Sequence, residues 1–304
     1  MKNLRLVALL SLAFLLGSAS TPLTASAGDQ PRQHNECLVV DTDAGLDDYR
    51  AIGALVPGRD VTAVVVTEGI SSVAGGATAT SMFLGGGSET PPVIAGLTSP
   101  APPDYDWLPA ARAGAERLNY FLSASVPFAG DPADLRRELR DAVYGCSTVD
   151  VLVLGPWTSF NTYAKQLGHR LGDVVVSGLP IAENHPDNFN CEYDLAACRA
   201  AGKALRPAQS AVWVDLPPST GTELTYAPTE EMVGRFEQAG LPGVLRAAML
   251  QTPSEWVGFT RLWDDAAALY VLDRRLFARQ GQHVEPKIGE DRFRELLIRA
   301  TNAG

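Results

Sequence analysis

Short runs of apolar, largely β-branched residues alternate along this chain with longer segments of helical periodicity. Runs this apolar are typical of strands buried on both faces, as in a parallel sheet covered by helices. The alternation therefore predicts an α/β fold with a mostly parallel sheet flanked by helices. The predicted strands span residues 37–41, 60–67, 92–96, 149–155, 173–177 and 211–216. The predicted helices span residues 47–55, 77–84, 109–122, 132–143, 158–167, 194–202, 229–239, 264–272 and 290–300.

The loops that follow the strands of such a sheet are where a ligand is expected, because the carboxyl ends of parallel strands share one edge. The segment DTDAGLDD begins where the first predicted strand ends, GPWTS follows the fourth strand, and GLPIAENHPDNFN follows the fifth. We expect these three loops to converge on one rim of the sheet.

The N-terminus has the layout of a secretory signal peptide. Lys2 and Arg5 precede an apolar run at residues 6–16, and the small residues Ala25, Ser26 and Ala27 follow. The apolar run is too short to span a bilayer comfortably, which disfavours the alternative of an N-terminal anchor helix. We predict that residues 1–27 are a signal peptide and that residues 28–304 form a single α/β domain, secreted or periplasmic.

The chain holds four cysteines, an even number that suggests two disulfides in an exported protein. Three pairings are possible. We favour Cys37 with Cys146, which would tie together the starts of two predicted strands, and Cys191 with Cys198, which would close a short loop. The sequence by itself leaves the choice open. The spacing contains no CxxC pair, which argues against a structural zinc site.

An excess of acidic residues excludes two classes of partner. Asp and Glu number 35 against 25 Lys and Arg, for a formal net charge of −10. Nucleic-acid binding and docking on an anionic membrane both require a basic face. No other apolar stretch reaches membrane length. We therefore predict neither a nucleic-acid nor a membrane partner, and we leave open whether identical chains assemble into an oligomer.

Four of the acidic residues, Asp41, Asp43, Asp47 and Asp48, fall within eight positions at the end of the first strand. Each has an ordinary structural reading, as an acceptor in a turn or as an anion in the first turn of a helix. Together they repel, by about 4 kcal/mol per close pair at an effective dielectric near 20. A cation removes that repulsion, and oxygen ligands without thiolates select calcium or magnesium. We expect Gly45 to permit the tight turn that brings them together.

This acidic segment, VVDTDAGLDDYRAIGAL, resembles the opening motif D-x-D-x-G-x-D-D of the inosine-uridine-preferring nucleoside hydrolase family. Three further segments resemble the family in the expected order. VLVLGPWTS resembles a strand followed by G-P-L-T-N, DNFNCEYDLAA resembles E-F-N-x-x-x-D-P-E-A-A, and LWDDAAALYVLD resembles a helix start with H-D-P-L-A-V-A. The resemblance runs from about residue 37 to the end, with residues 98–145 divergent.

The resemblance implies a nucleoside-hydrolase-like fold and a calcium-dependent enzyme that releases ribose and a free base from a small nucleoside or related riboside. It implies that Ca²⁺ is held by Asp43, Asp48, Asp264 and the backbone carbonyl of Leu154. A cation lowers the pKa of a bound water. Asp43 is the candidate base that takes the proton of the attacking water.

The resemblance also implies a set of substrate-binding residues. Asp47 and Asn190 match positions that hydrogen-bond ribose hydroxyls, and Asn184 lies where another such Asn often stands. Asn188 stands where the family usually has a Glu. Glu183 or Glu192 would have to compensate for that change, or the sugar differs.

The leaving-group residues depart furthest from the family. Trp263 stands in place of the His that precedes the late aspartate, and an indole cannot act as an acid near neutral pH. Trp263 can stack on a purine, and His185 is the candidate replacement acid on a predicted rim loop. Trp256, Phe259 and Trp263 are spaced for one helical face, which fits either a core stripe or a base-stacking wall.

Two alternatives to a nucleoside hydrolase remain at this stage. A non-catalytic binder of a ribosyl or diol ligand on the same fold would explain the missing Glu and His. A phosphatase of the haloacid dehalogenase type would use Asp41 as nucleophile and Asp43 as acid, although the clustered Asp47 and Asp48 fit it poorly.

Overall fold

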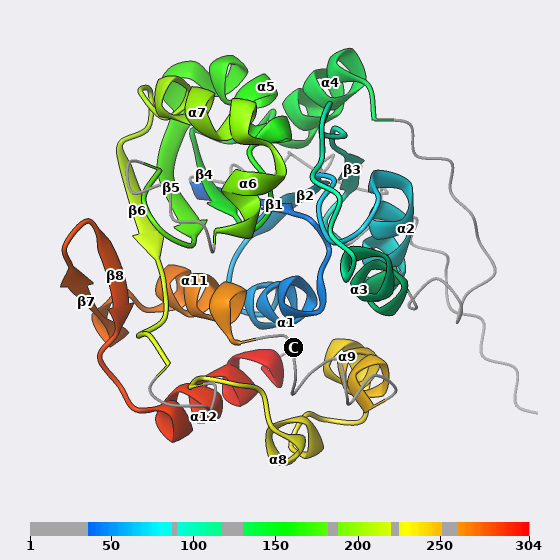
Figure 1. The fold of residues 1–304 in the computed structure, drawn as a ribbon, viewed down its shortest axis with the longest axis vertical. Helices are drawn as coiled ribbons and strands as arrows, with labels where there is room; N and C mark the ends of the chain where they lie inside the picture. The colour runs from blue at the N-terminus through cyan, green and yellow to red at the C-terminus, as the bar shows by residue number, and fades with distance from the viewer. Residues whose placement is uncertain are drawn as a thin grey trace, which may run out of the picture. The chain divides into compact units, whose positions relative to one another are not determined.

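One sheet of eight strands, in the order β3-β2-β1-β4-β5-β6-β8-β7, organises the chain (Figure 1). The computed structural model describes residues 36–86, 90–116, 130–181, 188–219, 225–250 and 261–303. Neighbouring strands are parallel throughout except for the antiparallel pair β7–β8. The strands are β1 Glu36–Thr42, β2 Val61–Val66, β3 Val93–Ala95, β4 Thr148–Val153, β5 Leu171–Ser177, β6 Ser210–Val214, β7 Phe277–Gln280 and β8 His283–Pro286.

Helices cover both faces of this sheet. Figure 1 shows α4, α5 and α7 on one side and α1, α11 and α12 on the other. The α-helices of the described segments are α1 Leu46–Leu55, α2 Val73–Phe83, α3 Leu108–Ala115, α4 Pro132–Ala142, α5 Thr158–Leu167, α6 Phe189–Tyr193, α7 Leu195–Ala204, α8 Glu230–Gly234, α9 Gly240–Leu250, α11 Trp263–Leu272 and α12 Glu290–Thr301. The predicted α/β architecture is confirmed.

The six predicted strands are all present, and most helix predictions differ from the structure by a few residues at the ends. The sequence analysis missed α6, α9 and the β7–β8 hairpin. The helix predicted at 229–239 is wrong beyond Gly234. There, Asn302 of the last helical segment accepts a hydrogen bond from the Glu237 amide (3.1 Å) and donates one to the Arg235 carbonyl (3.0 Å). This long-range contact satisfies backbone groups that a longer helix would have paired internally.

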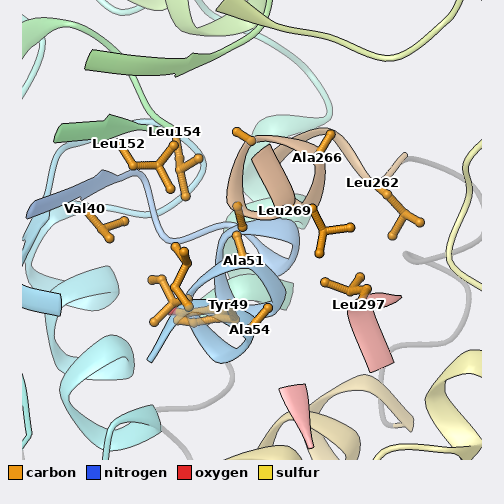
Figure 2. Packing of buried hydrophobic residues seen from close by; sticks show 14 of the residues in the cluster. Val40, Tyr49, Ala51, Ala54, Leu152, Leu154, Leu262, Ala266, Leu269 and Leu297 are labelled. Carbon is orange, nitrogen blue, oxygen red and sulfur yellow. The ribbon is translucent and has the colours of Figure 1, made fainter. Parts of the chain in front are cut away.

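The central strand β1 separates two hydrophobic clusters. Leu38 and Val40 point into the cluster beneath α1 and α11, whereas Cys37 and Val39 point into the cluster beneath α4, α5 and α7. This alternation follows the two-residue period of a strand. Figure 2 shows residues of the first cluster, among them Val40 of β1, Tyr49 of α1 and Leu269 of α11. Burial on both faces fixes the register that places the end of β1 at the rim.

Both favoured disulfide pairings are present in the structure. Cys37–Cys146 ties the start of β1 to the segment before β4, and Cys191–Cys198 ties α6 to α7. Within the residues described, no helix is both long and apolar enough to cross a membrane. Residues 1–35 lie outside the described segments, so the signal peptide and its cleavage near Ala27 stay predictions.

Candidate metal centre and active site

Three strand ends meet at the rim where the sequence places the acidic segment. In the sheet register, Asp41 of β1 pairs with Val153 of β4, and Val153 pairs with Val176 of β5. The Leu154 amide continues the ladder by donating to the Asp41 carbonyl (2.7 Å). The carboxyl ends of β1, β4 and β5 are therefore adjacent, as predicted.

In the turn between β1 and α1, Ala44 has a strained backbone conformation. Ala44 is buried and has a φ of 56°, a left-handed conformation that is unfavourable for a residue with a side chain. The Ser71 hydroxyl donates a hydrogen bond to the Ala44 carbonyl (2.9 Å), and the Ala44 amide donates one to the Thr42 hydroxyl (3.0 Å). These bonds hold the conformation in place.

We expected Gly45 to permit a tight turn through its backbone freedom, and that explanation is wrong. Gly45 has a φ of −74°, which any residue adopts, so backbone freedom does not explain it. A Cβ at this position would lie 2.9 Å from an Asp48 carboxylate oxygen and 3.0 Å from an Asp47 oxygen. Glycine is favoured here because the two carboxylates pack against the backbone.

Three carboxylates converge above the turn. Asp47, Asp48 and Asp264 each offer an oxygen, and these three oxygens lie within 4.8 Å of one another. Asp48 and Asp264 are 1% and 5% exposed, and Asp47 is half-buried. All three lie in the first turn of α1 or α11, where the helix macrodipole favours negative charge. Helix N-termini from opposite ends of the sequence thus supply one oxygen-lined site.

Asp48 and Asp264 are each held in place by neighbouring groups. The Thr42 hydroxyl donates to Asp48 Oδ1, and the Gly45 amide donates to Oδ2 (2.9 Å). The Ser177 side chain, at the end of β5, hydrogen-bonds Asp264. These donors fix the orientation of both carboxylates toward the site.

Asp43 lies beside this group and is enclosed by backbone. Its Oδ2 accepts a hydrogen bond from the Ile70 amide (3.1 Å). A Cβ on Gly69 would lie 2.2 Å from that oxygen, and a Cβ on Gly155 would lie 2.8 Å from the Asp43 amide. The loop after β2 and the loop after β4 therefore close around the candidate base at distances that only glycine permits.

Burial and neighbouring charge raise the pKa of three of these carboxyl groups, Asp43, Asp47 and Asp264. Burial, and then the neighbouring charge of Asp48, raise the pKa of Asp43 and of Asp264 well above the ordinary value. The same two causes raise the pKa of Asp47 to about 7. A divalent cation would reverse this by making each charged carboxylate favourable. Among the residues that the structure describes, those that converge on the site offer carboxylate oxygens, so they fit a hard cation.

Asp41 faces away from this group into a buried hydrogen-bond network. Thr67 donates to its Oδ1 (2.5 Å) and Tyr163 to its Oδ2 (2.8 Å), and the side chain is fully buried. Burial is the main cause that raises the pKa of Asp41 to about 7. A carboxylate with both oxygens bonded and no exposure cannot attack a phosphate, which argues against the phosphatase hypothesis.

Comparison with known proteins gives a match to solved structures. No protein-family model and no curated protein matches the sequence. The inosine-uridine preferring nucleoside hydrolase of Bacillus anthracis is 13% identical, with a TM-score of 0.61, and the match covers 89% of this chain and 100% of that one. A plant nucleoside hydrolase is 15% identical, with a TM-score of 0.64, over 88% and 99%. The purine-preferring ribonucleoside hydrolase of Gardnerella vaginalis is 16% identical, with a TM-score of 0.61, over 88% and 98%.

The chain has the nucleoside hydrolase fold. At this level of identity the match establishes the architecture, and the roles of individual residues rest on the geometry of this chain.

Within this nucleoside hydrolase fold, the structure groups the predicted metal ligands differently from the resemblance. Asp48 and Asp264 lie together as expected, but the third carboxylate of the group is Asp47, which the resemblance assigned to ribose. Asp43 stands next to Asp48. The Leu154 carbonyl accepts a hydrogen bond from the Asn190 amide (2.5 Å), so these two predicted site residues contact each other.

The other predicted substrate residues lie around this rim or outside the described segments. Asn188 precedes α6 and donates to the Leu179 carbonyl (3.4 Å). Trp263 begins α11 and packs against the core, and the Arg261 guanidinium carbon lies 5.7 Å from its ring centroid. Asn184 and His185, and also Trp256 and Phe259, lie outside the described residues.

The sequence analysis missed several polar residues that hold the nucleoside hydrolase rim in place. The positions of Thr42 and Ser177, each at the end of a strand, were a weak indication that their side chains lie at the rim. Arg112 gave none, because it lies in the divergent stretch. It donates to the carbonyls of Gly69 (2.9 Å) and Ile70 (3.0 Å), the loop that contacts Asp43.

Proposed function

We propose that residues 28–304 form an exported, calcium-dependent hydrolase that cleaves the N-glycosidic bond of ribonucleosides and releases ribose and a free base. The observation that carries this proposal is the group of Asp47, Asp48 and Asp264, with Asp43 beside it, at the rim of a nucleoside hydrolase fold. The names of the similar structures describe enzymes that act on nucleosides, which supports the substrate class.

The proposed cation site uses oxygen ligands from four segments. Asp48 and Asp264 are its centre, and Asp43, Asp47 and the Leu154 carbonyl complete the candidate set. When bound, Ca²⁺ supplies the positive charge that lowers the pKa of a water molecule and attracts the ribose hydroxyls.

The chain's own residues would perform the chemistry around this site. Asp43, ionised when a cation is bound, accepts the proton of the attacking water. The remaining carboxylates stabilise the positive charge that develops on ribose as the bond to the base breaks. Asp47, Asn184, Asn188 and Asn190 are proposed to bind the sugar.

Two further residues are proposed to act on the leaving base. Trp263, at the start of α11 and one position before Asp264, is proposed to stack on it. His185 is proposed to give the base a proton, the role that the indole cannot perform.

A nucleoside panel tests the proposal directly. The purified mature protein is incubated with inosine, uridine, adenosine and guanosine, in excess calcium or in EDTA, and released ribose is measured. We expect release from at least one nucleoside in calcium, little in EDTA, and little from the Asp43→Asn variant. Absence of ribose from all four substrates would reject the proposal.

A non-catalytic binder of a ribosyl or diol ligand is the second candidate. It is favoured because the side chains of Asn188 and Asn190 donate hydrogen bonds to backbone carbonyls, which leaves those donors unavailable to a ribose. Calorimetry with the same nucleosides would then show calcium-dependent binding without ribose release.

Export is part of the proposal and has its own test. Two disulfides are compatible with an oxidising compartment outside the cytosol. Mass spectrometry of the protein secreted by its host should give a mature N-terminus at Gly28. Light scattering on the same sample would measure whether identical chains assemble.

A further inference from the structure

A buried ion pair joins the two helices that carry the carboxylate group. Arg50 lies on α1 and Asp265 on α11, and both side chains are 0% exposed. The Arg50 Nε lies 3.0 and 3.1 Å from the two Asp265 oxygens, and Nη2 lies 2.8 Å from Oδ2. Nη2 also donates to the Arg261 carbonyl (3.3 Å), in the segment that leads into α11. The Arg50 guanidinium therefore holds both α11, through Asp265, and the segment just before α11, through the Arg261 carbonyl.

The two residues of the pair are close neighbours, in the sequence of each helix, of the carboxylates that form the site. Arg50 follows Asp48 by two positions in α1, and Asp265 follows Asp264 immediately in α11. The two helices are in contact, and Figure 2 shows them side by side, with Ala51 of α1 next to α11. Any shift of one helix along the other would move Asp48 relative to Asp264.

Stability alone does not account for this pair. Removing two charges from water is unfavourable, and apolar replacements of buried ion pairs are often neutral or stabilising. A small side chain such as Ala51 lets two helix backbones approach closely, but it interdigitates too little to fix the position of one helix against the other. A bidentate arginine–carboxylate contact has a defined direction and length, which supplies that positional constraint.

The pair as a whole also leaves the charge of the site unchanged. Arg50 alone would place a positive charge beside Asp47 and Asp264 and would oppose a bound cation. Asp265 cancels that charge at hydrogen-bond distance. Replacing both residues together therefore changes the geometry of the site but not its net charge.

We propose that the Arg50–Asp265 pair is a positioning device that fixes the first turns of α1 and α11, so that Asp47, Asp48 and Asp264 are held ready for a divalent cation. The proposal rests on the cation-binding part of the function proposed above, but not on catalysis. Neither residue of the pair itself contacts the cation in this arrangement.

Calcium binding by the double variant Arg50→Met/Asp265→Leu tests this proposal. Calorimetry on EDTA-treated, desalted protein measures the dissociation constant, and urea unfolding in EDTA measures stability. We expect a folded protein with stability equal to or above that of the wild type, and a calcium dissociation constant raised about 10- to 100-fold, the usual effect of losing a residue that orients metal ligands. A role in stability alone would leave the calcium affinity unchanged.

Two further variants complete the test. Arg50→Lys keeps the charge but loses the bidentate contact, so it should also weaken calcium binding even if the double variant does not fold. Arg235→Met/Glu295→Leu removes an exposed pair (2.6 Å) that joins the end of α8 to α12, and it should bind calcium as the wild type does.

The outcomes separate this inference from the proposed function. Wild-type calcium affinity in a folded double variant or in Arg50→Lys overturns the inference, even if the wild type releases ribose. Absence of calcium binding by the wild type overturns it as well. Weakened calcium binding in both variants, with no ribose release by the wild type, supports the inference and rejects the hydrolase.

Discussion

Without a bound cation, the protein should lose stability as the pH rises toward neutrality, and Asp41 allows the size of this effect to be worked out. Burial raises the pKa of Asp41 from its ordinary value of 3.8 to about 7 in the folded protein. The unfolded chain keeps the ordinary value. Between these two values the folded state holds a proton that the unfolded state has released, so stability falls as the pH rises.

The expected magnitude follows from the shift. Each unit of pKa corresponds to about 1.4 kcal/mol, so Asp41 alone accounts for about 4 kcal/mol between a pH of about 4 and about 7. Asp43, Asp47 and Asp264 have pKa values raised in the same direction and should steepen the decline. Carboxyls with lowered pKa, such as Glu295, lose their contribution only as the pH falls below the ordinary value, 4.5 for a glutamate.

Urea unfolding in EDTA at a series of pH values measures this effect. The matched control is Asp41→Asn, which retains an oxygen for Thr67 but cannot titrate. It should reduce the slope by up to about 1.4 kcal/mol per pH unit. Excess calcium should remove the part of the slope that comes from Asp43, Asp47 and Asp264, because the cation stabilises their ionised forms, and should leave the part from Asp41. A free energy of unfolding that rises or stays constant over this range in EDTA would refute the reasoning.

Three further predictions concern single features of the molecule. Asp264→Ala should nearly abolish ribose release and weaken calcium binding in calorimetry, and an unchanged calcium affinity would contradict its place in the site. Gly69→Ala should lower kcat strongly in the ribose assay, because its Cβ would lie 2.2 Å from an Asp43 oxygen; normal turnover would show that the loop can move aside. Serine at both Cys37 and Cys146 opens a loop with a sequence separation of 109 and should lower the free energy of unfolding by about 4–5 kcal/mol in denaturant titrations, whereas equal stability would argue against the disulfide.

The elements that the sequence predicted well are those with strong local patterns. The segment around β1 is apolar on both faces, and α5 was predicted with the bounds that the structure shows. The β7–β8 hairpin was missed because it lies at the sheet edge, where Arg279 and Gln280 are exposed and no apolar run marks a strand. Helix α9 was missed because Gly240 and Pro242 at its start read as a loop.

The sequence by itself determined the alternating elements and the acidic segment after the first strand, because burial periodicity and residue chemistry are local properties. It favoured two cysteine pairs but left the choice open, and the structure contains those pairs. The resemblance already grouped Asp264 with Asp43 and Asp48. The tertiary structure alone showed that Asp47 belongs with Asp48 and Asp264, and that Arg50 pairs with Asp265 across 215 positions. Such convergence depends on how two helices pack against one sheet. Spacing along the chain does not specify that packing, so the place of Asp47 in the carboxylate group and the Arg50–Asp265 pair could be found only in three dimensions.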